Sequence, residues 1–577
     1  MSALHCLPPR NLAVSACIGH VLDKIGIALL HSLYRAQPSV CAPVGAGGVR
    51  VFSGGVVVKT RSGMSGIIAV LGLLTATVGG TVIGAGPAVA ATCAGTGSDF
   101  NGDGLVDNVV TDPQATVNGV PQAGLVRVLY AGGKGVSEIS QATPGMGVAP
   151  ERGDQFGSAI AWTDFNGDGC TDLAIGSPNE DTGGDGSDVR DAGFLHIIYG
   201  SMSGIGTGST IESYTQAAFT PGANNEAGDR FAYALQAGTA DSGQPYLVVG
   251  VPGEGVVVDG VNHVNAGAVV YMQGTSRVTV TQNSEGVPGV VEDGDQFGAA
   301  LAGTNRYFAV GEPGETIGTD AVAAGGVAVF NHTLSAGVPT PLLGVDQAAV
   351  GEPLTGVAES GDRFGAALSM TGYRPSSQTY NSDALLAIGT PGESIGTIPG
   401  AGGVTVLRIE PSGKYTEIKA FDAGTANVEG DPAAGDFFGQ RVAITNTDTS
   451  VVTTTSTVRL AVGVPGRDVD GVKDAGAIHV FNPLDADIGT ADKILKRGSG
   501  VLPGAPNARD FTGVALRSGT SVLYVGIPYS KDSATTKGVL YTMPWTDIDG
   551  TTQVGTKTFQ PGVGGLSDIG TAFATVG

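Results

Sequence analysis

Two short segments of the sequence place oxygen-bearing side chains at the same fixed spacing. Both read Asp-Phe-Asn-Gly-Asp-Gly, followed by two residues and a further Asp. As nine-residue loops, they have Asp at positions 1, 5 and 9, Asn at position 3, and glycine at positions 4 and 6. Positions 1, 3, 5, 7 and 9 are Asp99, Asn101, Asp103, Leu105 and Asp107 in the first loop, and Asp164, Asn166, Asp168, Cys170 and Asp172 in the second.

This pattern suits a hard divalent cation. Calcium takes about six to eight oxygen ligands, and side chains at positions 1, 3, 5 and 9 can supply carboxylate or amide oxygens. Position 7 can contribute its backbone carbonyl, so Leu105 and Cys170 need no ligating side chain. The glycines let the backbone wrap around an ion. We therefore predict two calcium ions. The alternative is a pair of Asx-turn loops without metal.

The segments after the loops read as strands. Each loop begins like an EF-hand, but apolar residues arrive at Val109 and Leu173, and no Glu stands at position 12. Apolar runs bounded by glycine and proline are typical of strands. A strand therefore replaces the second helix of an EF-hand.

A recurring phrase, Gly-Asp-x-Phe-Gly, sets the period of the chain. Its Phe positions are residues 156, 231, 297, 364 and 438, and Thr512 fills that place in a weaker copy. Each copy precedes an apolar run ending in Gly-x-Pro, such as residues 173–178, and then a run introduced by glycine, such as residues 193–199. Three marked strands and a less regular fourth, every ~70 residues, indicate the blade of a β-propeller.

The seventh blade is predicted to be split between the two ends of the chain. Residues 109–113 and 124–130 match the second and third strands of a blade, without a Phe-Gly phrase before them. The missing phrase matches residues 567–574, with Ile569 in the Phe place. Pairing of the C-terminal strand with the first blade would close the ring and remove unpaired strand edges. The alternative is an open array of hairpins.

These phrases resemble FG-GAP repeats, over about residues 97–577. The resemblance implies an all-β fold, the seven-bladed β-propeller of integrin α chains and of secreted bacterial relatives, and the two loops match the calcium loops of such propellers. In integrin-like propellers, ligands bind on the face opposite the calcium loops. The long polar inserts at residues 179–191, 253–265 and 467–474 are expected on that face. The alternative is that they are simply solvated loops.

The segments before the repeats indicate export. Lys59 and Arg61 precede an apolar run over residues 67–85, and small residues follow up to Ala91. We expect a signal peptide at 57–90, cleaved after Ala90, although a retained membrane anchor is the alternative. Residues 1–56 are expected to be an unstructured or mis-assigned extension, and residues 91–577 to form the propeller.

Export permits a disulfide between the two cysteines that remain after residue 90. Cys93 lies just before the first loop and Cys170 inside the second. If the first two blades are neighbours, the two residues are within reach of one another, and we predict that they are bonded. The alternative is two unpaired thiols.

The charge distribution excludes some classes of partner. The net charge of the chain is −23, but residues 1–90 contain six basic residues and one acidic residue, so the remainder carries −28. Such an acidic body argues against nucleic acid and anionic membrane surfaces. We expect no stable membrane insertion after the signal is removed.

No catalytic motif accompanies the repeats. The sequence has no nucleophile elbow, phosphate loop or zinc-protease helix motif. His196 and His479 fall at equivalent places in their blades, which favours a structural role. We therefore expect a secreted or cell-surface binding or adhesion module for an extracellular protein or glycan. The alternatives are an exported hydrolase or lyase acting on polysaccharide or phosphoester, and a structural envelope protein.

Overall fold

The computed structural model describes residue 93 and residues 97–573, apart from 184–188, 207, 349–353, 499, 532–537 and 551–552. The predicted extension at 1–56 and signal peptide at 57–90 lie outside the described residues. Residues 89–577 form one compact unit.

This unit contains seven antiparallel sheets that follow one another along the chain. We call them blades 1 to 7. Each of blades 2 to 7 has four strands, which lie in the sheet in the same order as in the chain. Blade 1 has three strands among the described residues. The hairpin of β10 (Val256–Val258) and β11 (Val261–His263) is inserted into blade 3. The predicted seven-bladed propeller is therefore confirmed.

The strands are given by their place in the blade. The first strands are β4 (Ala159–Thr163), β8 (Leu235–Thr239), β14 (Ala300–Gly303), β18 (Ala367–Tyr373), β22 (Arg441–Asn446) and β26 (Ala515–Ser518). The second strands are β1 (Asn108–Asp112), β5 (Asp172–Ser177), β9 (Pro245–Val251), β15 (Tyr307–Glu312), β19 (Asp383–Thr390), β23 (Val458–Val464) and β27 (Val522–Ile527).

The outer half of each blade is formed by the third and fourth strands. The third strands are β2 (Leu125–Leu129), β6 (Phe194–Ile198), β12 (Ala268–Gln273), β16 (Gly326–Ser335), β20 (Gly403–Ile409), β24 (Ala477–Phe481) and β28 (Val539–Pro544). The fourth strands are β3 (Val136–Ile139), β7 (Ile211–Tyr214), β13 (Ser276–Val280), β17 (Val338–Val345), β21 (Tyr415–Asp422), β25 (Lys493–Leu495) and β29 (Lys557–Phe559).

In the described part of the chain, helices are few and short. They are the 3-10 turn η1 (Ala131–Gly133), α3 (Gln216–Phe219) and α4 (Trp545–Gly550). No helix among the described residues has both the length and the apolar character needed to cross a bilayer.

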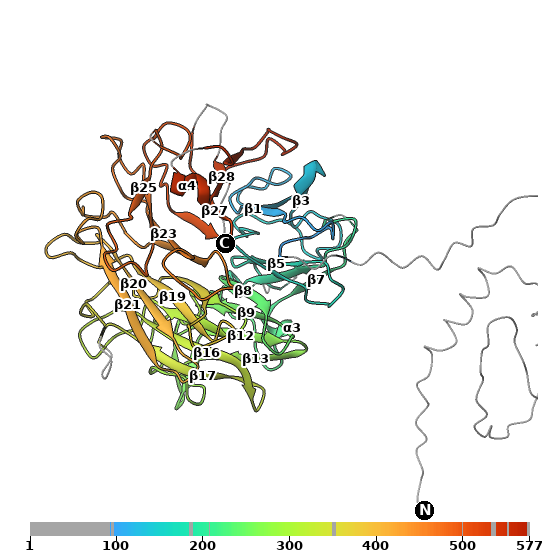
Figure 1. Ribbon diagram of the computed structural model, residues 1–577. Helices are drawn as coiled ribbons and strands as arrows, with labels where there is room; N and C mark the ends of the chain where they lie inside the picture. Colours follow the sequence, from blue (N-terminus) through green and yellow to red (C-terminus); the bar gives the residue numbers. More distant parts are fainter. Residues whose placement is uncertain are drawn as a thin grey trace, which may run out of the picture. The chain divides into compact units, whose positions relative to one another are not determined.

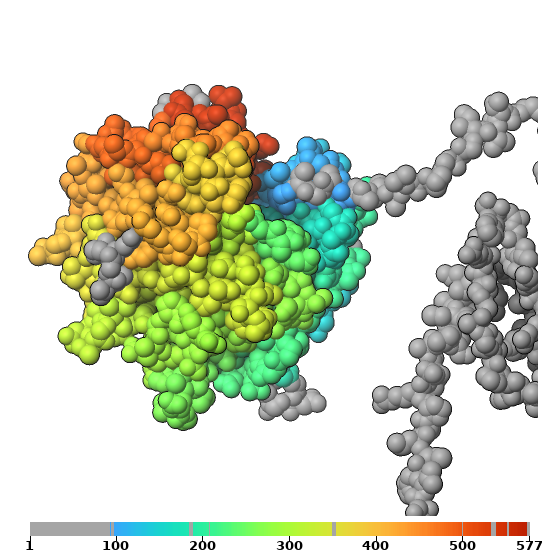
Figure 2. Space-filling model, turned by 60° about the horizontal axis from the view of Figure 1, so that its bottom comes forward, coloured from blue at the N-terminus to red at the C-terminus, as the bar shows by residue number. Residues whose placement is uncertain are grey.

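The blades are arranged around a centre, with the first beside the last (Figure 1). In the space-filling view the blue surface of blade 1 lies against the red and orange surface near the end of the chain (Figure 2). Val110 and Leu129 of blade 1 pack with Leu540 of blade 7 and with Phe573 in one buried cluster. The first strands of blades 2 to 7 are neighbours in turn and enclose a central cavity of about 240 Å³.

The recurring phrase joins each blade to the one before it. Phe297, for example, is fully buried, and its N–H donates to the carbonyl of Ala266 in the preceding blade. Gly267 forms a parallel bridge with Phe297, and a Cβ at Gly267 would lie 2.4 Å from that backbone. Only glycine tolerates this approach together with the φ of +88° found there. The second strand, covered on both faces by neighbouring sheets, is buried throughout in blades 2 and 4.

The seventh copy of the phrase is shifted from the predicted position. Phe573, not Ile569, bridges Gly538 of blade 7 in the way that Phe297 bridges Gly267. Phe573 is fully buried, whereas Ile569 is 39% exposed. In the sequence, Gly570 follows Ile569 and so imitates the Phe-Gly of the phrase. The buried site between blades requires an aromatic ring, however, and Phe573 supplies it, although Ala574 and not glycine follows Phe573 in the sequence. The Phe place was therefore predicted four residues too early.

The C-terminal segment nevertheless contacts blade 1, through side chains. Asp112 at the end of β1 accepts hydrogen bonds from the N–H groups of Thr571 (2.7 Å) and Ala572 (2.9 Å). The fully buried Arg127 of β2 donates to the carbonyl of Ile569 at 2.5 Å. Strand pairing that would close the ring involves residues outside the described part of the chain, so it stays a prediction.

Candidate metal centre

The two oxygen-rich loops lie side by side on neighbouring blades. The first loop leads into β1, and the second connects β4 to β5. Thr171 of the second loop donates its N–H to the carbonyl of Asp99 (3.1 Å) and its hydroxyl to the carbonyl of Gly97 (2.9 Å). Phe100 of the first loop is fully buried against the edge of Trp162. The second loop therefore lies between the first and second strands of blade 2, and the two loops share one face.

Position 1 organises the turn of each loop. Both oxygens of Asp164 accept backbone hydrogen bonds, from Gly167 at 2.7 Å and from Gly169 at 2.8 Å. In the first loop, Asp99 accepts in the same way from Asp103 at 3.1 Å and Gly104 at 2.8 Å. Asp99 is fully buried. The two loops, on different blades, thus have the same internal hydrogen bonds because they share the same sequence pattern.

Positions 3 and 5 complete that pattern. Asn166 and Asp168 accept hydrogen bonds from the N–H groups of Asp168 (2.9 Å) and Cys170 (2.8 Å), and Asn101 and Asp103 do the same in the first loop. The glycines at positions 4 and 6 all have positive φ. A Cβ at Gly102 would also lie 2.5 Å from the sulfur of Cys93, so glycine is required there on both grounds.

Position 9 fastens the loop to its own blade. The carboxylate of Asp172 accepts from the N–H of Phe165 (2.8 Å) and from the N–H of Gly200 after β6 (2.9 Å). Asp107 accepts from Phe100 and Ala131 in the same way. Burial raises the pKa of both carboxyls, that of Asp172 to about 7. A carboxylate has about four lone-pair sites, so either group can bind an ion while keeping both hydrogen bonds.

The donor set of the second loop fits calcium. Asp164, Asn166 and Asp168 are partly or fully exposed, and among the described residues no Lys or Arg pairs with them. At position 7, the side chain of Leu105 is 46% exposed and that of Cys170 is buried, and the carbonyl ligand at this position stays a prediction.

The first loop differs by one basic neighbour. The ammonium of Lys134 lies 3.0 Å from Asp103 Oδ2, and it lowers the pKa of Asp103. Lys134 directly follows η1 and lies beside the first loop in space. It is 31 positions from Asp103 in sequence, so the motif alone could not reveal it. It competes directly with a cation at position 5.

The predicted disulfide is present. Cys93 is bonded to Cys170; their Cα atoms are 4.9 Å apart and their sequence positions differ by 77. The bond ties the segment before the first loop to position 7 of the second. It therefore fixes both loops with respect to one another, a constraint expected to contribute roughly 2–4 kcal/mol.

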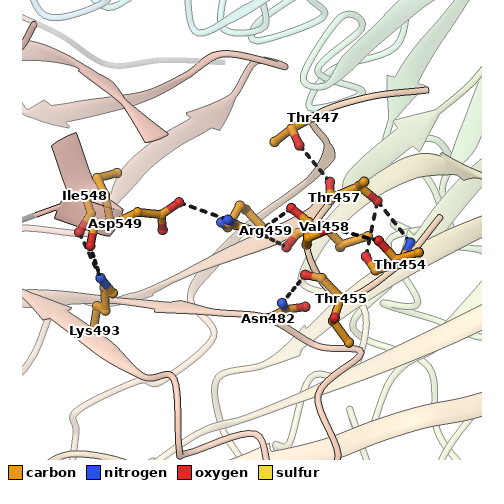
Figure 3. A network of polar contacts seen from close by, with 11 residues as sticks. Thr447, Thr454, Thr455, Thr457, Val458, Arg459, Asn482, Lys493, Ile548 and Asp549 are labelled. Carbon is orange, nitrogen blue, oxygen red and sulfur yellow. Dashed lines mark hydrogen bonds and ion pairs between the residues drawn. The ribbon is translucent and has the colours of Figure 1, made fainter. Parts of the chain in front are cut away.

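Other blades stabilise the equivalent connection without an acidic loop. Between β22 and β23, the hydroxyl of Thr447 donates to the carbonyl of Thr457, whose own hydroxyl donates to the carbonyl of Thr454 (Figure 3). Asn482 donates to Thr455, and Arg459 donates to Asp549 at 2.9 Å (Figure 3). Hydroxyls, an arginine and the single carboxylate of Asp448, which accepts hydrogen bonds from Ser450, hold this connection, so a concentration of carboxylates is not a general requirement of the fold.

A second acidic feature, missed from the sequence, is buried at the other end of the blades. In blades 2 to 5 a Glu two residues after the Gly-x-Pro proline accepts a hydrogen bond from a buried Gln of the preceding blade. The pairs are Glu180 with Gln141, Glu254 with Gln216, Glu315 with Gln282, and Glu393 with Gln347. The Asp of the recurring phrase lies beside each Glu. These are Asp154, Asp229, Asp295 and Asp362. The recurrence of Glu after the proline was the signal in the sequence.

Burial and the neighbouring carboxylate raise the pKa of these groups. That of Glu315 is raised to about 8 and that of Asp295 to about 7. Burial, with the charge of the neighbouring carboxyl, raises the pKa of Asp154 to about 6 and that of Glu180 to about 9. In blade 6 an arginine replaces the Glu, and Arg467 lies 3.1 Å from Asp436. In blade 7 Ser530 stands at the Glu place, and Arg497, which follows β25 of blade 6, donates to Ser530 and lies 2.9 Å from Asp510.

The histidines serve structural roles. His196 of β6 is fully buried, contacts Ser213 at 2.9 Å, and has a pKa lowered to about 3 by burial. His479 occupies the equivalent place in β24 beside Asp492. Neither they nor His263 or His332 line the central cavity.

The FG-GAP repeat family model matches residues 156–197, which include the second loop. Phosphatidylinositol-glycan-specific phospholipase D of Mus musculus is 34% identical over 111 residues, or 19% of this chain and 13% of the mouse protein. The protein of that name from Rattus norvegicus is 32% identical over 111 residues, 18% and 13% of the two chains. This chain thus matches only about an eighth of the length of these curated relatives.

Two solved structures are weakly similar. The periplasmic gluconolactonase of Pseudomonas aeruginosa has a TM-score of 0.39 at 14% identity, over 82% of this chain and 99% of that one. Sqt1 of Saccharomyces cerevisiae has a TM-score of 0.34 at 11% identity, over 71% and 86%. Likenesses this weak support no inference about function.

Proposed function

We propose that this seven-bladed FG-GAP repeat propeller is an exported calcium-binding module that acts by binding an extracellular protein or glycan. The observation that carries the proposal is the duplicated loop. Two copies, on neighbouring blades, adopt the same hydrogen-bonding pattern and group three carboxylates and an amide around one turn. Such an oxygen-rich site suits calcium, and the disulfide suits an oxidising compartment.

The ligand-binding role is supported by the opposite face. The inserts after the second strands form small hairpins, among them β10–β11 and the bridges Thr182–Val189 and Val469–Val472. A rigid sheet scaffold that presents several adjacent loops is a common arrangement for recognition. The charge of −28 after residue 90 disfavours nucleic acid as the partner.

A hydrolase is the second candidate, and the described channel gives it little support. The cavity enclosed by the first strands is lined by apolar, amide and hydroxyl residues with Arg441 and Arg517, and by neither a carboxylate nor a histidine. General acid–base chemistry needs such groups within hydrogen-bonding reach of a substrate. The match to the mouse phospholipase D covers only 13% of that protein's length, so its activity is not assigned to this chain.

The test is a binding array read alongside an activity screen. The chain from residue 91 is applied to glycans and extracellular-matrix proteins, once in millimolar calcium and once with a chelator. We expect binding to at least one class of ligand, weakened by the chelator. The same sample is screened with glycoside and phosphodiester substrates, including a glycosylphosphatidylinositol. Turnover without array binding would replace the binding role with the hydrolase.

A further inference from the structure

The central channel opens on the face opposite the calcium loops through a cavity of about 590 Å³. This mouth lies where the first strands begin, beside the recurring phrases and the prolines that end the second strands. The second calcium loop joins the far end of β4. The mouth is therefore surrounded by the polar inserts and separated from the metal centre by the length of a strand.

The mouth is basic in an acidic protein. Arg230, Arg363 and Arg441 line it, and no Asp or Glu does. All three arginines are exposed. Among the described residues none of them forms an ion pair, and Arg441 makes one long hydrogen bond, from Nε to the carbonyl of Val514 at 3.4 Å. Residues 91–577 carry a net charge of −28. A site with three unpaired guanidinium groups and no carboxylate therefore differs from the rest of this acidic protein.

The repeat explains how these side chains converge. Arg230 and Arg363 occupy the x of Gly-Asp-x-Phe-Gly, at φ of +57° and +60°. The same place is Gln155 in blade 2 and Gln296 in blade 4, also lining the mouth and also at positive φ. A left-handed backbone costs non-glycine residues roughly 1 kcal/mol or more, so every blade from 2 to 5 places a long polar side chain at the rim in spite of that cost.

Amide and aromatic groups complete the lining. Gln440 and Asn179 stand beside the arginines, and Tyr233 is 42% exposed within the cavity. Deeper in the channel, the guanidinium of Arg517 lies 3.7 Å above the ring of Trp162. Amides hydrogen-bond to vicinal hydroxyls, an exposed ring stacks on a sugar face, and arginine binds carboxylate or sulfate in bidentate fashion.

We propose that this mouth binds an acidic saccharide, with the arginines contacting its carboxylate or sulfate groups. The inference rests on the proposed binding role and names the class of ligand. An acidic peptide shares the anionic chemistry, so it serves as the competing ligand in the test; the exposed ring of Tyr233, which can stack on a sugar face, favours the saccharide. Arg363 is the central contact, since Arg230 also borders an adjoining depression that contains Asp191.

Titration calorimetry with defined probes tests the site. Trigalacturonate supplies carboxylates and a sulfated chondroitin tetrasaccharide supplies sulfates; maltotriose is the neutral control and hexaglutamate the acidic-peptide control. We expect one of the two acidic saccharides to bind, maltotriose to bind at least tenfold more weakly, and affinity to fall with added salt. Arg363→Gln and Arg441→Gln should each weaken binding about tenfold.

Arg152→Gln is the matched control, because Arg152 is exposed, directly precedes the phrase of blade 2 and does not line the mouth. It should leave affinity unchanged. Equal loss in Arg152→Gln and Arg363→Gln, or tighter binding of hexaglutamate than of either saccharide, would overturn the assignment. If the array shows a neutral or cationic ligand whose binding ignores Arg363→Gln, the binding role stands and the mouth inference fails. If no ligand binds at all, both fail.

Discussion

At the scale of single residues, the two oxygen-rich loops could be recognised in the sequence because all their predicted calcium ligands fall within nine positions. Cys170 is an example. At position 7 of its loop only the backbone carbonyl is predicted to bind an ion, so the sulfur is available for a disulfide, and it is bonded to Cys93. Lys134 shows what the motif cannot reveal, since its ammonium reaches Asp103 through the fold. Local patterns predict local groups, and neighbours from distant positions require the structure.

Replacing Asp168 with Ala should remove calcium-dependent stabilisation by the second loop. A site at about 100 times its Kd in free calcium contributes about 2.7 kcal/mol, so we expect the Tm in calcium to fall by several degrees and calcium to have less effect on it. Differential scanning calorimetry with and without chelator measures this. Asp241→Ala, in the short β8–β9 turn, is the control and should keep the full calcium shift. An unaltered shift in Asp168→Ala would refute the site.

Replacing Lys134 with Met should strengthen calcium binding at the first loop. The ammonium, 3.0 Å from Asp103, is 56% exposed, and exposed ion pairs are worth about 0.2–1 kcal/mol. We therefore expect a roughly two- to fivefold gain in affinity, measured by calcium titration in the Asp168→Ala background so that only the first loop responds. Lower affinity in Lys134→Met would mean that the lysine supports the loop rather than competing for it.

At the scale of elements, strand order and limits followed the predicted phrases because glycine and proline mark both ends of each run. The buried acidic pairs escaped notice, although Glu180, Glu254, Glu315 and Glu393 recur in phase. Each pair joins the connection after a second strand to the Asp of the phrase, with a Gln from the preceding blade. Three segments that are separate in sequence meet at each pair. The periodicity of the sequence shows that the Glu recurs, but it does not show which residues the Glu contacts.

These pairs should make the protein less stable as the pH rises. The folded pKa of Asp295 and Glu315 is about 7 and 8, above the usual values for an unfolded chain, about 4. Between those limits the folded state holds more protons, so the free energy of unfolding decreases with pH. In saturating calcium we expect a Tm several degrees higher at pH 5 than at pH 8. The measurement is a series of thermal melts across that range.

Glu315→Gln tests the cause of that dependence. It removes one ionising group while keeping a partner for Gln282, so the variant should be more stable than the wild type at pH 8 and similar to it at pH 5. Glu410→Gln provides the control, because Glu410 is a half-buried acidic residue that lies outside these pairs. Parallel Tm curves for wild type and Glu315→Gln would show that the pair does not govern the pH dependence.

At the scale of the whole propeller, the count of seven blades followed from repetition, but the join between its ends was predicted in the wrong register. Ile569 precedes a glycine and so imitates Phe-Gly, whereas the fold selects the ring of Phe573 for the buried site against Gly538. The channel mouth was not predicted at all. Its lining comes from five blades, and only closure of the ring places those residues together.

Arg127 should be the principal side chain holding blade 1 to the C-terminal segment. It is fully buried, pairs with Glu138 at 2.8 Å, donates to Ser567 and to the carbonyl of Ile569, and its guanidinium lies 5.3 Å from the ring centre of Phe573. Loss of one partner from a buried charge network costs roughly 3–5 kcal/mol. Arg127→Met should therefore lower the Tm markedly and speed hydrogen exchange at the amides of β1 and β2.

Arg459→Met is the matched comparison, because Arg459 also joins two blades through an ion pair, but with Asp549, whose side chain is 43% exposed (Figure 3). A pair of this kind contributes at most about 1 kcal/mol, and its loss should leave exchange in β1 and β2 unchanged. If Arg127→Met proves as mild as Arg459→Met, the ends of the chain are held by backbone pairing alone. A large and local effect would instead show that side chains of blade 1 fasten the C-terminal segment to it.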